Sequence, residues 1–154
     1  RSGESGIPGF CPPTWIQWEE NCYKDTGESL SLAQARNKCV QMGGVVVVPQ
    51  SGSERLFLRQ FVPEESQYGS RIWIDCNDMQ EEGQWECKEG QTEVTLTEMP
   101  WYPGEPDNVN DREHCAMLNF WLDASGAFHD INCGGDLYAV CKQPLHLVSP
   151  KLHL

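Results

Sequence analysis

WYPGEPDNVNDREHCAMLNFWLDASGAFHDINC, residues 101–133, is the stretch from which the rest of the chain is interpreted. Its acidic residues include Glu105, Asp107, Glu113 and Asp130, in a region rich in glycine, proline and asparagine. Crowded carboxylates repel one another, so they are tolerated when they are solvated or when a cation lies among them. Carboxylate, carbonyl and water oxygens are the ligands that Ca²⁺ prefers. The stretch therefore predicts either a solvated acidic loop or a calcium site.

The order and spacing of these residues resemble the calcium-dependent sugar site of C-type lectin domains. Glu105-Pro106-Asp107 stands where that family has Glu-Pro-Asn or Gln-Pro-Asp, and Glu113 comes two residues before a cysteine. His129-Asp130 takes the place of the Asn-Asp pair that the family has ahead of its next cysteine. The resemblance implies an α+β C-type lectin fold with two helices, two small antiparallel sheets, a long calcium-binding loop region and several disulfides.

Length and composition fit one globular domain. The chain has 154 residues, 39% of them hydrophobic, and its six Trp residues help to supply one core. It has no run of about 18 apolar residues, so no membrane span is predicted, and no signal peptide is visible at the start. The formal net charge of −12 argues against nucleic acid as a partner, because phosphates are bound by clusters of Lys and Arg.

Eight cysteines at uneven spacing in so short a chain indicate disulfides, and therefore a secreted or extracellular protein. Close Cys/His pairs in zinc-finger spacing are absent from the sequence. Counting alone leaves many pairings open. The resemblance implies the pairs Cys11–Cys22, Cys39–Cys141 and Cys115–Cys133. The remaining two cysteines stand at positions unusual for the family, on two neighbouring predicted strands, and are expected to form a local bridge, Cys76–Cys87.

The domain is expected to span residues 11–143. Residues 1–10 contain a three-residue glycine period, so they are expected to be either a flexible leader or the remnant of a collagen-like stalk. Residues 144–154 have no counterpart in the family pattern and are expected to form a tail.

Apolar spacing predicts two helices and several strands. Residues 29–44 have apolar positions at helical spacing and Gly43 as a C-terminal stop, which predicts the first helix. Val45 to Val48 is a β-branched run that predicts a buried strand. Ser53 is the expected cap of a second helix over residues 53–61. Residues 71–87 resemble two neighbouring strands of the family, with Asp75 at a position usually held by Gly.

The resemblance implies one Ca²⁺ held by Glu105, Asp107, Glu113 and Asp130. His129 stands at the position usually held by Asn, and these five residues together are the expected carbohydrate-binding set. In the family, the proline at the position of Pro106 follows a cis peptide bond, which turns the flanking side chains toward one ion. Glu105-Pro106-Asp107 taken alone is equally an ordinary turn.

Two departures from the family pattern leave the sugar class open between mannose and galactose types. Glu105 and Asp107 are both hydrogen-bond acceptors when ionised, so the usual amide donor is missing. His129 replaces the second amide, and an imidazole is a poorer ligand for a hard ion. Galactose-binding members often have an aromatic residue where this chain has Val109. Three outcomes are open. His129 donates a hydrogen bond to a sugar hydroxyl, or the calcium site has fewer ligands and binds the ion more weakly, or no ion binds.

A second, structural calcium site of the family would correspond here to Asp78, Glu82, Asn108, Glu113 and His114. Two of these positions lack the carboxylate of the family pattern, so the site is expected to be weak or empty. Asp78 and Glu82 are equally ordinary turn residues.

The sequence thus predicts a calcium-dependent lectin whose partners are glycans. The alternative is a module of the same fold that binds a protein, mineral or ice surface without recognising sugar. An enzyme is not expected, because the four histidines stand without a matching Ser or Cys nucleophile. A homo-oligomer is compatible with the weakness of single sugar sites, and a role in innate immunity is an expectation at the level of the family.

Overall fold

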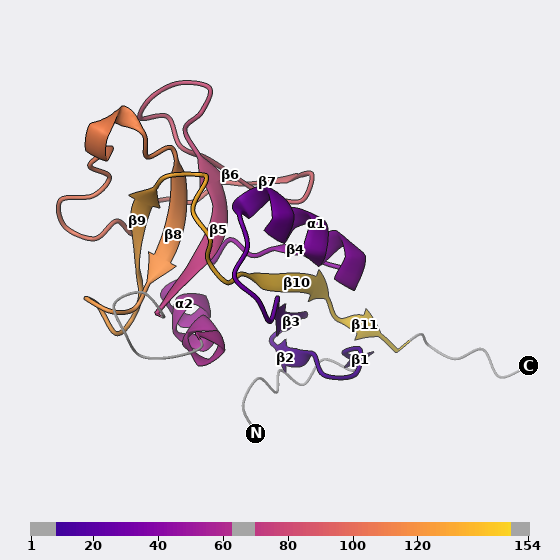
Figure 1. Ribbon diagram of the computed structural model, residues 1–154. Helices are drawn as coiled ribbons and strands as arrows, with labels where there is room; N and C mark the ends of the chain where they lie inside the picture. Colours follow the sequence, from indigo (N-terminus) through magenta and orange to yellow (C-terminus); the bar gives the residue numbers. More distant parts are fainter. Residues whose placement is uncertain (1–8, 63–69, 149–154) are drawn as a thin grey trace, which may run out of the picture.

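The computed structural model describes residues 9–62 and 70–148 (Figure 1). The first eight residues of the expected leader and the last six of the expected tail lie outside the described residues. The described chain forms two α-helices and three antiparallel sheets. None of its helices is long and apolar enough to cross a membrane.

Two of the sheets bring the beginning and the end of the chain together. A four-stranded sheet has the order β2 (Ile16–Trp18), β3 (Asn21–Asp25), β10 (Val140–Pro144) and β4 (Val45–Val46). Beside it, β1 (Gly9–Phe10) pairs with β11 (His146–Leu147), which adds a third sheet to the two predicted. The domain boundaries at residues 11 and 143 stay predictions, but strand pairing continues outside them on both sides.

A five-stranded sheet positions the loops that carry the acidic residues. Its order is β7 (Thr92–Val94), β6 (Glu86–Glu89), β5 (Arg71–Asn77), β8 (Cys115–Asn119) and β9 (Ala127–Ile131). The connections from β5 to β6 and from β7 to β8, the second of which contains a 3-10 helix (Val109–Asp111), extend from one end of this sheet. In Figure 1 they lie at the upper left, on the opposite side of the molecule from β1 and β11.

Helix α1 (Leu32–Met42) ends at Gly43 as the sequence predicts, and it begins three residues inside the predicted range of 29–44. Ser31 caps it in a capping box with Gln34, and Gly43 follows in the left-handed conformation at φ 97°. Leu32, Ala35 and Cys39 are buried, and the helix packs against β4 and β10 (Figure 1). The helical spacing of the sequence is therefore confirmed as a buried face.

Helix α2 (Gly52–Leu58) continues as a 3-10 helix (Arg59–Phe61). The prediction of Ser53 as its cap is wrong, because the Ser51 side chain accepts the Glu54 backbone N–H at 3.0 Å. Ser51 has the extended backbone that a capping residue needs, at φ −153°, whereas Ser53 already lies inside the helix.

The predicted strand at Val45 to Val48 is shorter than expected. Only Val45 and Val46 pair with β10, although Val46, Val47 and Val48 are all buried. The Val47 N–H still donates to the Val140 carbonyl of β10 at 3.0 Å, and the Val48 N–H donates to the Glu89 carboxylate at 2.8 Å.

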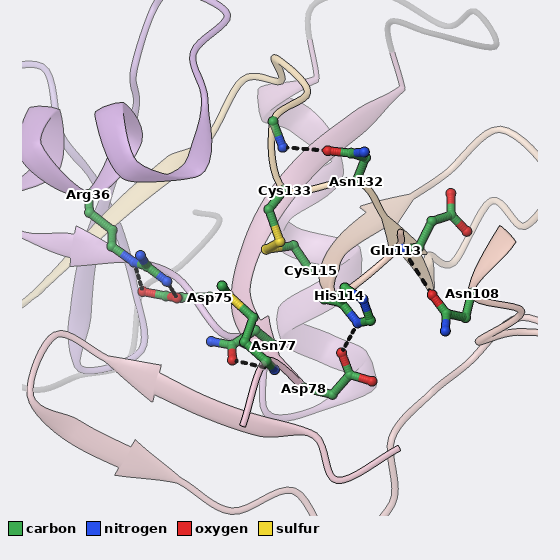
Figure 2. The surroundings of a disulfide bond; sticks show 12 residues. Arg36, Asp75, Asn77, Asp78, Asn108, Glu113, His114, Cys115, Asn132 and Cys133 are labelled. Atoms are coloured by element: carbon green, nitrogen blue, oxygen red, sulfur yellow. Dashed lines mark hydrogen bonds and ion pairs between the residues drawn. A yellow bond between two sulfur atoms is a disulfide. The ribbon is translucent and has the colours of Figure 1, made fainter. Parts of the chain in front are cut away.

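All four predicted disulfides are present: Cys11–Cys22, Cys39–Cys141, Cys76–Cys87 and Cys115–Cys133. Asp75, which replaces a usual Gly, is buried directly before Cys76 and accepts two hydrogen bonds from Arg36 at 2.7 and 3.0 Å (Figure 2). A bidentate pair of this kind satisfies the buried carboxylate.

Candidate metal and ligand sites

The loop that carries Glu105 and Asp107 is fastened to strand β9. Tyr102 donates its N–H to the Phe128 carbonyl at 2.9 Å, and Phe128 donates to the Pro100 carbonyl at 2.8 Å. The peptide bond between Glu105 and Pro106 is cis, as the family resemblance implies. This attachment places the loop opposite the end of β9, where Asp130 lies.

Three of the four predicted calcium ligands come together at this place. One carboxylate oxygen from each of Glu105, Asp107 and Asp130 lies within 4.8 Å of the others. Asp130 is buried, and its two oxygens accept the N–H groups of Asp107 at 3.1 Å and Asn108 at 2.6 Å. Asp130 in turn donates its own N–H to Glu105 at 3.3 Å. The backbone of the loop therefore orients the Asp130 carboxylate, and the backbone of β9 orients the Glu105 carboxylate.

Glu113 reaches this group through Asp107. Its carboxylate shares a hydrogen bond with the Asp107 carboxyl and accepts the Val109 N–H at 3.2 Å. The Glu113 N–H donates to the Asn108 side-chain oxygen at 3.0 Å, a contact drawn in Figure 2. Glu113 thus lies beside the three converging carboxylates rather than among them.

Two carboxyls of this site have raised pKa values. Burial, followed by the Asp130 and Asp107 carboxyls, raises the pKa of Glu105 to about 8. Burial and the Asp107 carboxyl raise the pKa of Glu113 to about 7. The hydrogen bond from Glu113 lowers the pKa of Asp107 below its usual value. A cation among these oxygens can replace the shared protons. The set contains only carboxylate oxygens, which fits Ca²⁺.

His129 forms a wall of the same site. Its ring is buried and stacks on Tyr102 with 5.1 Å between ring centroids and 16° between ring planes. Burial lowers the pKa of His129, which favours the neutral imidazole. Nδ1 lies 3.9 Å from a Glu105 oxygen, and Nε2 has no hydrogen-bond partner among the described residues.

Tyr102 was not among the residues singled out from the sequence. Its place directly after Trp101 and before Pro103-Gly104 gives no periodic or motif signal. Its position against His129 follows from the pairing of the loop with β9.

A second group contains three of the residues predicted for the structural calcium site: Asp78, Glu82 and His114. His114 Nδ1 lies 3.0 Å from an Asp78 oxygen and 3.4 Å from a Glu82 oxygen (Figure 2 shows the contact with Asp78). The hydrogen bond to Asp78 raises the pKa of His114. The Asn108 side chain makes its contacts elsewhere, donating to Asp111 at 2.9 Å. Asn108 as a ligand of this site stays a prediction.

Comparison with known proteins identifies the fold. The family model described as Lectin C-type domain matches residues 28–143. Human C-type lectin domain family 4 member E is 27% identical over 140 residues, a match that covers 91% of this chain and 62% of the human protein. This chain therefore spans less than two thirds of that relative.

Solved structures agree with this match. The carbohydrate-recognition domain of cow CD23, solved in the presence of a GlcNAc2Man3 oligosaccharide, is 28% identical with a TM-score of 0.71, and the match covers 88% of this chain and 97% of that chain. Herring type II antifreeze protein has a TM-score of 0.72 at 21% identity, covering 88% of this chain and 99% of the other, which is a likeness of fold alone. With the family model spanning most of the sequence, the chain belongs to the C-type lectin domain family.

Proposed function

We propose that this domain binds glycan hydroxyls through one Ca²⁺ held by Glu105, Asp107, Glu113 and Asp130. The observation that supports the proposal most is the convergence of three carboxylates within 4.8 Å on a loop and on strand β9, which hydrogen-bond to each other. A bound Ca²⁺ supplies a positive centre to which neutral hydroxyl oxygens of a sugar can coordinate.

The protein groups have separable tasks in this proposal. Asp130 is buried and fixed by two backbone N–H groups, so it holds the position of the ion. Asp107 is exposed and Glu105 half-buried, so their outer oxygens face the solvent from which a glycan arrives. Glu113 keeps Asp107 in place through their shared hydrogen bond.

His129 is the proposed hydrogen-bond donor to the sugar. Neither Glu105 nor Asp107 offers an N–H when ionised, whereas a neutral imidazole carries one N–H and one acceptor nitrogen. Stacking on Tyr102 restricts the ring to one orientation. A relative solved with an oligosaccharide present, cow CD23, favours a glycan as the ligand class.

The second candidate function is binding of a protein, mineral or ice surface without sugar recognition. The absence of a side-chain amide at residues 105, 107 and 129 favours it, because family members that bind mannose or galactose pair each coordinated hydroxyl with such a donor. Both candidates are binding functions, so we propose no catalytic activity for the domain.

The deciding experiment is a glycan array probed with the domain clustered on a multivalent carrier, with calcium and again with excess chelator. Clustering is needed because single sugar sites bind weakly. Signals that disappear with chelator would support the lectin function and name the sugar class.

The Asp107→Asn variant sharpens the experiment. It restores the Glu-Pro-Asn motif and with it an amide donor, so a lectin is expected to gain mannose-type binding. Asp136→Asn, an exposed acid outside the site, is the matched control and is expected to behave as the unmodified protein. If the unmodified protein and Asp107→Asn are both silent toward all glycans, the second candidate function replaces the first.

The disulfides bear on the cellular location of the domain. Four disulfides favour an extracellular or secreted location, because thiols stay reduced in the cytosol. We further propose that the protein acts as an oligomer, since several copies multiply a weak single-site affinity.

A further inference from the structure

Three metal-ligating side chains meet at a place that the proposed function does not use. Asp78 directly follows β5, His114 directly precedes β8, and Glu82 lies in the loop after Asp78. One ligand atom of each lies within 4.8 Å of the others. Asn77 pairs with Cys115 where β5 and β8 meet, which brings residues 36 positions apart to adjacent strand ends.

The backbone holds two of these side chains in place. The Asp78 N–H donates to the His114 carbonyl at 3.0 Å, and the Gly83 N–H donates to the Asp78 carboxylate at 2.9 Å. The disulfides Cys76–Cys87 and Cys115–Cys133 begin within two residues of these positions (Figure 2). The Asp78 side chain is fully buried, whereas 56% of the Glu82 side chain is exposed. An ion can therefore approach from the side of Glu82 and meet ligands that are already oriented.

The donor set differs in kind from the one at Glu105. It contains an imidazole nitrogen with two carboxylates, whereas the other group contains only carboxylates. Ca²⁺ and Mg²⁺ are bound by oxygen, while imidazole favours Zn²⁺, Cu²⁺ and Ni²⁺. Three protein ligands with an open position are a common arrangement around Zn²⁺.

We propose that Asp78, Glu82 and His114 bind a transition-metal dication of the Zn²⁺ class, at a site separate from the calcium site. The proposal does not rest on the proposed function, because its three ligands are different side chains from those of the calcium site, although His114 directly follows Glu113 in the chain. The chain would then carry two cation sites: one with only carboxylate ligands for Ca²⁺, and one with an imidazole ligand for a Zn²⁺-class ion.

The test is a calorimetric titration of the full chain with ZnCl₂ in the presence of saturating calcium. One Zn²⁺ per chain is expected to bind while calcium remains bound. His114→Asn and Glu82→Gln are each expected to weaken zinc binding by about tenfold or more, since loss of even a supporting group of a metal site typically costs that much. His146→Asn removes an exposed histidine outside the site and is the control, expected to leave zinc binding unchanged.

Two results would overturn the proposal. One is zinc binding by His114→Asn and Glu82→Gln at the affinity of the unmodified chain. The other is loss of zinc binding in Asp130→Asn, which would place zinc at the calcium site. If circular dichroism shows that His114→Asn does not fold, the zinc affinity of Glu82→Gln decides the test. The Glu82 side chain is mostly exposed, so its replacement is expected to leave the fold intact. Loss of calcium binding in Asp130→Asn with zinc binding intact would separate the two sites.

Discussion

Glu105 and Glu113 carry protons that calcium has to displace. Their pKa values are raised to about 8 and about 7, so both are largely protonated near pH 6 when no cation is bound. Calcium affinity is expected to rise between about pH 6 and pH 9, by up to about tenfold per unit for each proton released, and then to level off. Calcium titrations across this range measure the effect, and a constant affinity would contradict it.

The same two carboxyls give the calcium-free protein the opposite pH trend in stability. Their folded pKa values lie above the usual 4.5, so the folded chain binds more protons than the unfolded chain between these values. Their stabilisation is complete below about pH 4.5 and is lost as the pH rises through about 8. The melting temperature of the calcium-free protein is expected to fall over that range. A Glu105→Gln, Glu113→Gln double variant is expected to show a smaller fall, and an identical fall would assign the trend to other groups.

Lys142 is the cation of a buried ion-pair network. Its Nζ lies 2.9 Å from Glu54 and 3.3 Å from Glu89, and Tyr23 donates to the same Glu54 oxygen at 2.7 Å. Lys142→Met leaves two carboxylates without their cation and is expected to cost about 3–5 kcal/mol of unfolding free energy.

The control for Lys142→Met is the exposed pair of Lys38 with Glu28, whose charged atoms lie 2.8 Å apart. Lys38→Met is expected to cost at most about 1 kcal/mol, because water screens an exposed pair. Urea unfolding measures both variants, and equal losses would contradict the role assigned to burial.

At the scale of the element, α2 tests how local signals define a helix end. Ser51→Ala removes the side chain that accepts the Glu54 N–H and is expected to cost about 1 kcal/mol of stability. Ser53→Ala, inside the first turn, is expected to change stability by less than about 0.5 kcal/mol. Thermal or urea unfolding compares the two, and a larger loss for Ser53→Ala would restore the cap predicted from the sequence.

The two serines also illustrate what a pattern within one element can predict. Ser51 and Ser53 both precede the apolar positions Phe57 and Leu58, so the spacing alone fits a cap at either. The choice depends on the backbone of residue 51, which is set by how the chain leaves the buried valines. Beyond the strand at Val45 and Val46, a distant segment also decides the contacts, because Glu89 from another hairpin accepts the Val48 N–H.

At the scale of the whole molecule, the disulfides differ in how much chain they close. Cys39–Cys141 joins residues 102 apart and Cys76–Cys87 joins residues 11 apart. Because a cross-link stabilises mainly by restricting the unfolded chain, replacing the first pair with alanines is expected to cost about 5 kcal/mol and the second about 3 kcal/mol. Denaturant unfolding of the two double variants without metal provides the comparison. A larger loss for Cys76–Cys87 would show that its bridge acts on the folded state.

The sequence by itself determined the family, the four disulfides and the helical faces, and it grouped the acidic residues of the candidate site. These depend on spacing along the chain, which a motif or a helical period records directly. Tertiary structure alone decided that Tyr102 stacks on His129, that Glu113 hydrogen-bonds to Asp107 outside the group of three converging carboxylates, and that the Asn108 side chain donates to Asp111. Such contacts depend on which loops the strand pairing of β5, β8 and β9 brings together, and spacing within one segment carries no information about its neighbour across a sheet.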